Sequence, residues 1–173
     1  NNLPAETEDF RSFFEWFRAR EDLENERRLR AEGQIGVRDR DMEAVRAVLC
    51  TVLPEFANPM VRRLPETLVM EKSGVELRVD RLSDGEKLLI ALGGDLARRI
   101  ALANPSMENP LHGEGVVLID EIEQHLHPAW QRTIIGNLRR TFPNVQFIVS
   151  THSPQVLGEV EPGNIRRIAI GED

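Results

Sequence analysis

Two adjacent carboxylates follow a short aliphatic run in the second half of the chain. Val116–Ile119 is purely aliphatic, and Asp120 and Glu121 come directly after it. Such a run is typical of a buried parallel strand, and open α/β sheets bind ligands at the carboxyl ends of their strands. In a nucleotide hydrolase the first carboxylate would belong to a Mg²⁺ shell and the second would activate a water. The pair alone is equally typical of a strand that ends in a solvated acidic loop.

A second motif opens a predicted helix. Ser83 and Glu86 have the spacing of a capping box, which satisfies the backbone donors at a helix N-terminus. Together with Asp84 and Gly85 they also have the composition of a phosphate-binding helix start. A glycine lets a phosphate approach the free N–H groups, and the helix dipole attracts its charge. By itself the segment favours the capping role.

The third motif is a histidine that follows another aliphatic run. Phe147–Val149 leads into Ser150, Thr151 and His152, so His152 is expected at the carboxyl end of a second strand. There it could contact a terminal phosphate or an attacking water. A histidine after a strand is more often a structural hydrogen-bonding group, and the motif alone favours that role.

The order of the three motifs resembles the C-terminal half of an ABC-type ATPase head of the SMC/RecF-like soluble branch. Asp120 lies 35 residues after Gly85, and His152 lies 32 residues after Asp120. The resemblance covers most of residues 68–170. It implies an α/β fold, namely the C-terminal lobe of a P-loop NTPase with a parallel sheet core and a helical lateral lobe. It also implies ATP, Mg²⁺ and a homodimer, because such heads hold two ATP molecules between two subunits.

The same resemblance implies a role for each motif. Asp120 is the Mg²⁺-associated residue, Glu121 is the catalytic glutamate, and His152 is the switch histidine. The signature motif supplies the cofactor-binding residues, which are Ser83, Asp84, Gly85 and Glu86.

Two stretches carry a narrower resemblance. Residues 15–26 and 120–131 look like the predicted ATP-binding proteins of bacterial defence operons, to which the Septu and retron-associated ATPases are similar. The resemblance implies a role in anti-phage defence or DNA repair, with an effector nuclease as partner. Direct DNA contact is left open, since three arginine pairs are more typical of ordinary surface charge in an acidic chain.

Several positions depart from the family pattern. Ile122 stands where transporters have proline, His127 stands at the D-loop aspartate, and Asp84 stands at the second signature glycine. These departures keep open a nucleotide-binding switch with little hydrolysis. The ATPase part of an overcoming-lysogenization-like nuclease is another alternative. His125 and His127 also raise a metal site, but two histidines without a third ligand make it the weaker interpretation.

The phosphate-cradling motif G-x-x-x-x-G-K-[S/T] does not occur in the 173 residues, and a glutamine loop is not recognisable. In the resembled family both precede the signature motif. We therefore expect the Walker A half to lie upstream and this segment alone to be inactive. On this interpretation residues 1–66 form the helical lateral lobe, and residues 67–173 carry the signature helix, the Walker B motif and the H-loop.

The periodicity of the chain predicts the elements that position these motifs. A helix is expected over 5–31 with a stripe of phenylalanines, and its last part, from Glu24, is a charge run that is expected to be solvated. Gly93 and Gly94 inside the third helix predict tight packing against that face. The remaining predicted elements are a helix from Asp39 to Pro54, a hairpin around Ser73-Gly74, the third helix over 84–104, a strand over 116–120, a helix over 128–141, a strand over 146–151, a short helix after Pro154 and a strand over 165–170. A parallel sheet covered on both faces follows from this order.

Composition limits the function classes. A net charge of −7 excludes a domain that coats nucleic acid by bulk charge, although a local basic patch stays compatible with it. The longest aliphatic run is far too short for a membrane span, so no membrane partner is expected. The single cysteine, Cys50, cannot form an internal disulfide, which fits a cytoplasmic setting.

Overall fold

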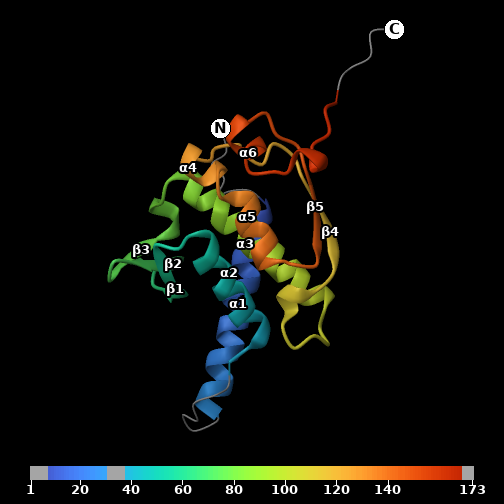
Figure 1. The fold of residues 1–173 in the computed structure, drawn as a ribbon. Coiled ribbons are helices and arrows are strands. Elements are labelled where there is room, and N and C mark those ends of the chain that lie inside the picture. Colours follow the sequence, from blue (N-terminus) through green and yellow to red (C-terminus); the bar gives the residue numbers. More distant parts are fainter. Residues whose placement is uncertain (1–7, 31–37, 169–173) are drawn as a thin grey trace.

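The computed structural model describes residues 8–30 and 38–168 (Figure 1). Its helices are α1 (Glu8–Arg30), α2 (Arg40–Val52), α3 (Asp84–Ala103), α4 (Pro128–Gln131), α5 (Ile134–Thr141) and α6 (Pro154–Leu157). Its strands are β1 (Phe56–Arg63), β2 (Glu66–Lys72), β3 (Val75–Arg78), β4 (Gly115–Ile119) and β5 (Val145–Val149). The first three strands form an antiparallel sheet in the order β1-β2-β3, and β4 pairs in parallel with β5.

The packing of α1 and α2 against α3 confirms the tight contact predicted at the two glycines. Phe13 of α1 is fully buried, and an ideal Cβ on Gly94 would lie 2.5 Å from its ring. An ideal Cβ on Gly93 would lie 3.2 Å from Val52 and 3.3 Å from Val48, both on α2. The glycines therefore let three helices approach closely and form the centre of the core.

The parallel pair is covered on only one face by the described residues. The half-buried side chains of its inner face pack against the core: Val117, Ile119, Phe147 and Val149. On the other face Val116, Leu118 and Ile148 are 59%, 76% and 52% exposed. The prediction of a sheet covered on both faces is therefore wrong for this part of the chain. An aliphatic face of this kind is unusual for a parallel sheet, which is normally buried on both sides.

Two predicted elements need correction. The helix expected over 128–141 is split into α4 and α5 by a turn in which the Thr133 amide donates to the Trp130 carbonyl at 3.0 Å. The β-branched run Thr133–Ile135 favours such an interruption. Residues 165–168 are not a strand, because they form no hydrogen-bond ladder with another described segment. The end of that predicted strand, 169–170, lies outside the described residues.

The strand β1 was not predicted. It contains Pro59, which cannot donate to a ladder, and Asn58, whose φ is +51°. Its pairing with β2 shifts register between Ala57 and Met60. The proline and the bulge conceal the strand pattern. The predicted division between residues 66 and 67 falls after the first residue of β2, and it stays a prediction.

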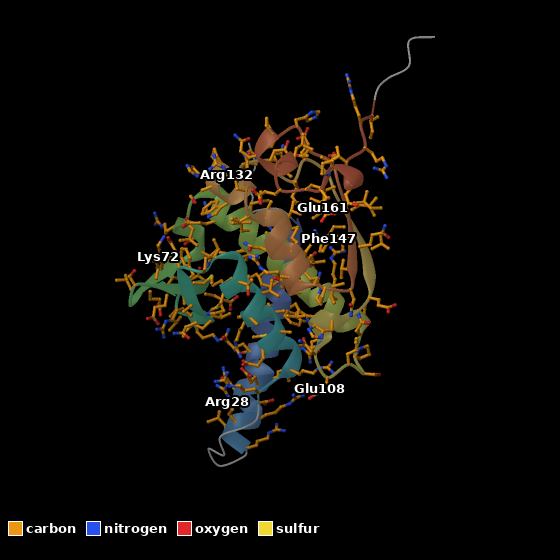
Figure 2. All side chains as sticks on the ribbon, viewed as in Figure 1. Arg28, Lys72, Glu108, Arg132, Phe147 and Glu161 are labelled. Carbon is orange, nitrogen blue, oxygen red and sulfur yellow. The ribbon has the colours of Figure 1, made fainter. Side chains whose placement is uncertain are left out.

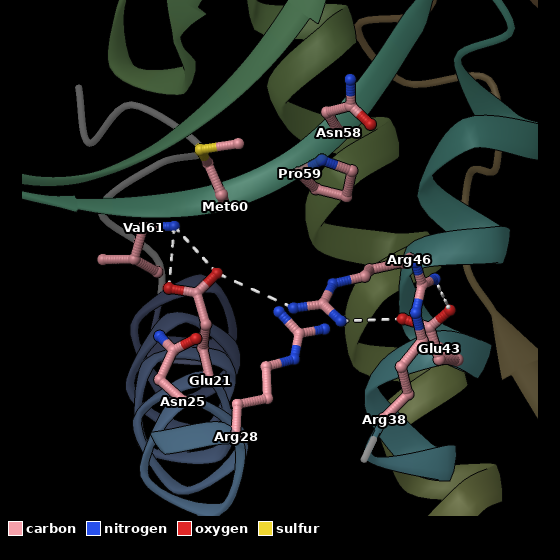
Figure 3. A pocket seen from close by; sticks show the side chains of 10 residues that line it. All are labelled: Glu21, Asn25, Arg28, Arg38, Glu43, Arg46, Asn58, Pro59, Met60 and Val61. Atoms are coloured by element: carbon pink, nitrogen blue, oxygen red, sulfur yellow. Dashed lines mark hydrogen bonds and ion pairs between the residues drawn. The ribbon is translucent and has the colours of Figure 1, made fainter. Parts of the chain in front are cut away.

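A charged network joins α1, α2 and β1, and we define it as Glu21, Glu24, Asp39 and Arg46. Both oxygens of Glu21 accept the Val61 amide, at 3.2 and 3.1 Å. Glu24 accepts the Asp39 amide at 3.0 Å and pairs with Arg46 at 2.9 Å. Figure 3 shows Arg46 reaching toward the α1 helix beside a pocket of about 370 Å³. Glu24 is only 1% exposed, so the prediction that the charge run is solvated is wrong at this residue.

The described residues include no helix that is both long enough and apolar enough to cross a bilayer.

Candidate active site

The carboxyl ends of β4 and β5 lie at one edge of the parallel pair, as the sequence predicts. Ile119 pairs with Val149 at the last position of the register, so the loops that follow them begin side by side. The loop after β4 carries Asp120 and Glu121, and the loop after β5 carries His152. Figure 1 places this edge near α4 and α6, and Figure 2 shows the side chains in the same view with Phe147 marking β5.

Ser150 joins the two loops from the β5 side. Its hydroxyl donates to a carboxylate oxygen of Asp120 and accepts the Glu121 amide at 2.9 Å. Its own amide donates to the Ile119 carbonyl at 3.0 Å, which extends the strand ladder by one step. Glu121 has a φ of +46°, a region that residues other than glycine rarely adopt. Ser150 therefore bonds to the backbone of Glu121 in a conformation that the chain would not favour alone, and to the side chain of Asp120.

Glu123 joins the same loops from the β4 side. Its carboxylate accepts the Thr151 hydroxyl at 2.5 Å and the His152 amide at 2.6 Å. Burial alone would raise the pKa of Glu123, but these two hydrogen bonds lower it below the usual glutamate value. The residue is thus an ionised acceptor at neutral pH.

The donor set at this edge suits a Mg²⁺ ion that a nucleotide helps to hold. Asp120 and Glu121 are both exposed, and they offer carboxylate oxygens beside the hydroxyl of Ser150. Within the described part of the chain, no group of three or more His, Cys, Asp or Glu is arranged to hold a metal ion. Magnesium is commonly bound by one or two carboxylates together with substrate phosphates and waters, so this arrangement fits it.

The structure gives His127 a structural use. Its Nδ1 accepts the Ala129 amide at 3.2 Å and so caps α4. The lone pair that would ligate a metal is therefore occupied, and the alternative of a metal site at His125 and His127 finds no support.

The signature segment begins α3 and forms the capping box that the sequence predicts. The Ser83 amide and hydroxyl both donate to Glu86, at 2.8 and 2.7 Å. An ideal Cβ on Gly85 would lie 2.8 Å from the Trp130 ring and 3.0 Å from the His125 carbonyl. Gly85 therefore packs against the segment that follows Glu121 in the same chain. This close approach accounts for the glycine without a phosphate, so its role in binding ATP stays a prediction.

In the described part of the chain, the remaining signature residues form no direct hydrogen bond with the strand-end residues. Asp84 is exposed and lies 3.5 Å from Lys87 Nζ in an ion pair. Among the described residues, no hydrogen bond links the four signature residues to Asp120, Glu121 or His152. Sequence reasoning missed Ser150 and Glu123 as site residues. Ser150 had a signal, since it is the first polar residue after its strand, whereas nothing in the sequence singled out Glu123.

Residues 4–158 match a family model described as "AAA domain, putative AbiEii toxin, Type IV TA system". The chain belongs to this AAA-domain family. It is 46% identical over 136 residues to "Retron Ec83 probable ATPase" of Escherichia coli, which is 79% of this chain and 25% of that protein. It is 47% identical over 130 residues to "Retron Vc95 probable ATPase" of Vibrio cholerae serotype O1 biovar El Tor, covering 75% of this chain and 25% of that protein. The Septu protein PtuA of Bacillus mycoides is 36% identical over 96 residues, which is 56% of this chain and 13% of PtuA.

Solved structures place the fold of this AAA-domain chain among SMC ATPase heads. An SMC head bound to the C-terminal winged-helix domain of ScpA superposes with a TM-score of 0.50 and 19% identity, covering 69% of this chain and 36% of that one. A structure from a study of ATP-driven dimerisation and DNA-stimulated activation of SMC ATPases gives 0.50 and 20%, covering 69% and 73%. The chain spans about a quarter of the length of the two retron relatives.

Proposed function

We propose that the full-length protein binds and hydrolyses ATP at the carboxyl ends of β4 and β5. The observation that carries the proposal is the pair of joined loops at this edge, where exposed Asp120 and Glu121 are fixed by Ser150 beside the loop of His152. The family and the "probable ATPase" names of the retron relatives support the reaction.

Each residue has a separate task in this proposal. Asp120 provides oxygens for a Mg²⁺ ion, which would neutralise phosphate charge when bound. Glu121 accepts a proton from the attacking water, a role that contributes about 10²- to 10⁴-fold in rate. His152 contacts the terminal phosphate. Ser150 fixes the backbone of Glu121 and a carboxylate oxygen of Asp120, which reduces the reorganisation that the site needs before reaction.

A phosphate-binding segment outside these 173 residues would complete the site. The sequence has no Walker A motif, and Val116, Leu118 and Ile148 leave an aliphatic face of the parallel pair open. The retron relatives are about four times longer than the matched region, which leaves room for such a segment. We therefore propose that residues 1–173 do not hydrolyse ATP alone, and that the open face packs against the segment that carries the phosphate loop.

Dimerisation would give the signature residues their role. Gly85 and Ser83 are not bonded to Asp120 or His152 in one chain, so we propose that they contact the nucleotide of a second copy. The solved structure from work on ATP-driven dimerisation of SMC ATPases supports this arrangement by fold. The similarity to the retron and Septu proteins supports a further part of the proposal, a role in anti-phage defence. In that role the dimer would control an effector nuclease.

Steady-state ATP turnover by the full-length protein tests this proposal. Glu121→Gln keeps the shape of the side chain but cannot accept a proton, so turnover should fall at least about 100-fold while ATP binding persists. The 173-residue segment should show neither ATP turnover nor ATP binding. Equal turnover by wild type and Glu121→Gln would contradict the proposal. Tight ATP binding without turnover in the wild type would instead favour a nucleotide-binding switch.

A further inference from the structure

We propose that Glu123 is a positioning residue that holds the His152 loop against the Glu121 loop. The inference rests on the proposed ATPase function and adds a residue to it. Glu123 lies two positions after Glu121, yet the two carboxylates have different surroundings. Glu121 is exposed, whereas Glu123 is half-buried and bonded to the neighbouring loop.

Both oxygens of the Glu123 carboxylate are occupied. Oε1 accepts the His152 amide at 2.6 Å, and Oε2 accepts the Thr151 hydroxyl at 2.5 Å. The Thr151 oxygen in turn accepts the Ser153 amide at 3.1 Å. With each oxygen bonded to the His152 loop and the side chain half-buried, this carboxylate is less available to a water than the exposed carboxylate of Glu121. The geometry therefore separates the two glutamates into a base, Glu121, and a positioning group, Glu123.

The imidazole of His152 depends on its backbone for its position. The side chain is exposed and forms no hydrogen bond with any described residue. Its neighbour Ser153 is buried and donates to Gln131 Oε1 at 2.6 Å, and Gln131 donates to the Leu126 carbonyl at 2.8 Å. The His152 segment is thus bonded on both sides to the stretch that follows Glu121, through Glu123 on one side and Gln131 on the other.

The two loops are bonded to each other from both sides, by Ser150 and by Glu123. Ser150 reaches from the β5 loop to Asp120 and Glu121, and Glu123 reaches from the β4 loop to Thr151 and His152. A displacement of one loop therefore displaces the other. If both loops contact the same nucleotide, misplacing His152 by about 1 Å should lower the rate by about 100-fold.

Full-length protein carrying Glu123→Ala or Glu123→Gln tests the inference. Alanine removes both acceptors, so single-turnover hydrolysis should fall about 100-fold, with the ATP dissociation constant changed less than about threefold. Glutamine retains an oxygen for the His152 amide and an NH₂ group that can donate to Thr151, so it should restore the rate to within about fivefold of wild type. Exposed Glu159→Gln, two residues after the end of α6, is the matched control and should match wild type.

Hydrogen exchange over residues 150–153 provides a readout that is independent of turnover. The His152 amide should exchange at least about tenfold faster in Glu123→Ala than in wild type, because its acceptor is gone. If Glu123→Ala does not fold, Thr151→Val removes one of the two bonds and Thr151→Ser should restore it.

Each contrary outcome has a distinct meaning. Equal loss of turnover in Glu123→Ala and Glu123→Gln would make Glu123 a base and overturn the positioning role. Normal turnover or unchanged exchange in Glu123→Ala would also overturn it, while leaving the ATPase proposal intact. A wild-type protein that does not hydrolyse ATP overturns both proposals.

Discussion

The charged network and the strand-end site treat their carboxylates in opposite ways. In the network, Glu21 and Glu24 are buried and bonded to Val61, Asp39 and Arg46. At the strand ends, Asp120 and Glu121 are exposed, and both are bonded to a neutral hydroxyl, that of Ser150 in the loop after β5. Charges in the first region are satisfied within the fold, whereas those in the second are fixed in place but keep oxygens available for a ligand.

The pKa values of the network carboxylates follow from this burial. Burial raises the pKa of Glu21, against the opposing effects of the Val61 amide and the arginines nearby. Burial would also raise the pKa of Glu24, but hydrogen bonds from Arg46 and the Asp39 amide lower it below the usual value. Two glutamates three residues apart on α1 are thus shifted in opposite directions. At Glu21 burial outweighs the Val61 amide and the nearby Arg63 and Arg46, whereas at Glu24 the hydrogen bonds from Arg46 and the Asp39 amide outweigh burial.

Removing Glu24 should produce the largest effect on stability. Glu24→Ala leaves Arg46 without its best-buried partner, which should lower the free energy of unfolding by about 3 kcal/mol. Urea unfolding measures the change. Glu26→Ala on the same helix is the control, since its pair with Arg30 is exposed on both sides and should contribute no more than about 0.5 kcal/mol. Equal effects of the two variants would contradict the claim that the buried carboxylate of the charged network stabilises the fold.

Removing the Ser150 hydroxyl should produce the complementary result. Ser150→Ala frees the Glu121 amide and one oxygen of Asp120, so single-turnover ATP hydrolysis by the full-length protein should fall about 30-fold. The free energy of unfolding should change by no more than about 1 kcal/mol, because the site is exposed. Exposed Ser106→Ala serves as the control. A loss of stability as large as that of Glu24→Ala would show that Ser150 serves the fold.

How far the sequence predicts each region depends on the range of its contacts. The phenylalanine stripe on α1 and the tight packing at the glycine pair of α3 follow from the sequence, because both patterns are local. That these two faces meet is seen only in the structure. The placement of Asp120 at a strand end follows from an aliphatic run alone. The burial of Glu24 does not follow from a local pattern, because it depends on Arg46, which lies 22 residues away on another helix.

The contacts of Ser150 and Glu123 could not be predicted from the sequence either. They exist because β4 and β5 pair with one particular register and because Glu121 turns the chain with a positive φ. Neither the register between distant strands nor a left-handed residue has a signature in these residue types. Sequence patterns therefore located the edge of the sheet, and the three-dimensional pairing determined which side chains join there.

A substitution in the helical core should have an intermediate effect. Gly94→Ala places a methyl group 2.5 Å from the Phe13 ring, so overpacking should lower the free energy of unfolding by about 2 kcal/mol. Phe13→Leu makes room, and the double variant should be more stable than the sum of the single changes predicts. Strict additivity in thermal or urea unfolding would contradict the contact.

The pH dependence of the free energy of unfolding should show the smallest effect, a difference between Glu24 and Glu21. The lowered pKa of Glu24 means that its contribution is present above the unfolded glutamate value and is lost as the pH falls through the folded value. The raised pKa of Glu21 means that its contribution grows as the pH falls through the folded value toward the unfolded one. Urea unfolding of wild type, Glu24→Gln and Glu21→Gln between neutral and acidic pH should therefore give difference curves of opposite slope. Curves of the same slope would contradict the assignment.

The central claim is tested most directly by measuring ATP turnover and the free energy of unfolding on the same full-length preparations of Glu121→Gln and Glu24→Gln. We expect Glu121→Gln to lose at least about 100-fold in turnover with unchanged stability. Glu24→Gln should lose stability but retain turnover at temperatures where it is folded. If turnover instead follows stability in both variants, the strand-end carboxylates are not the catalytic centre.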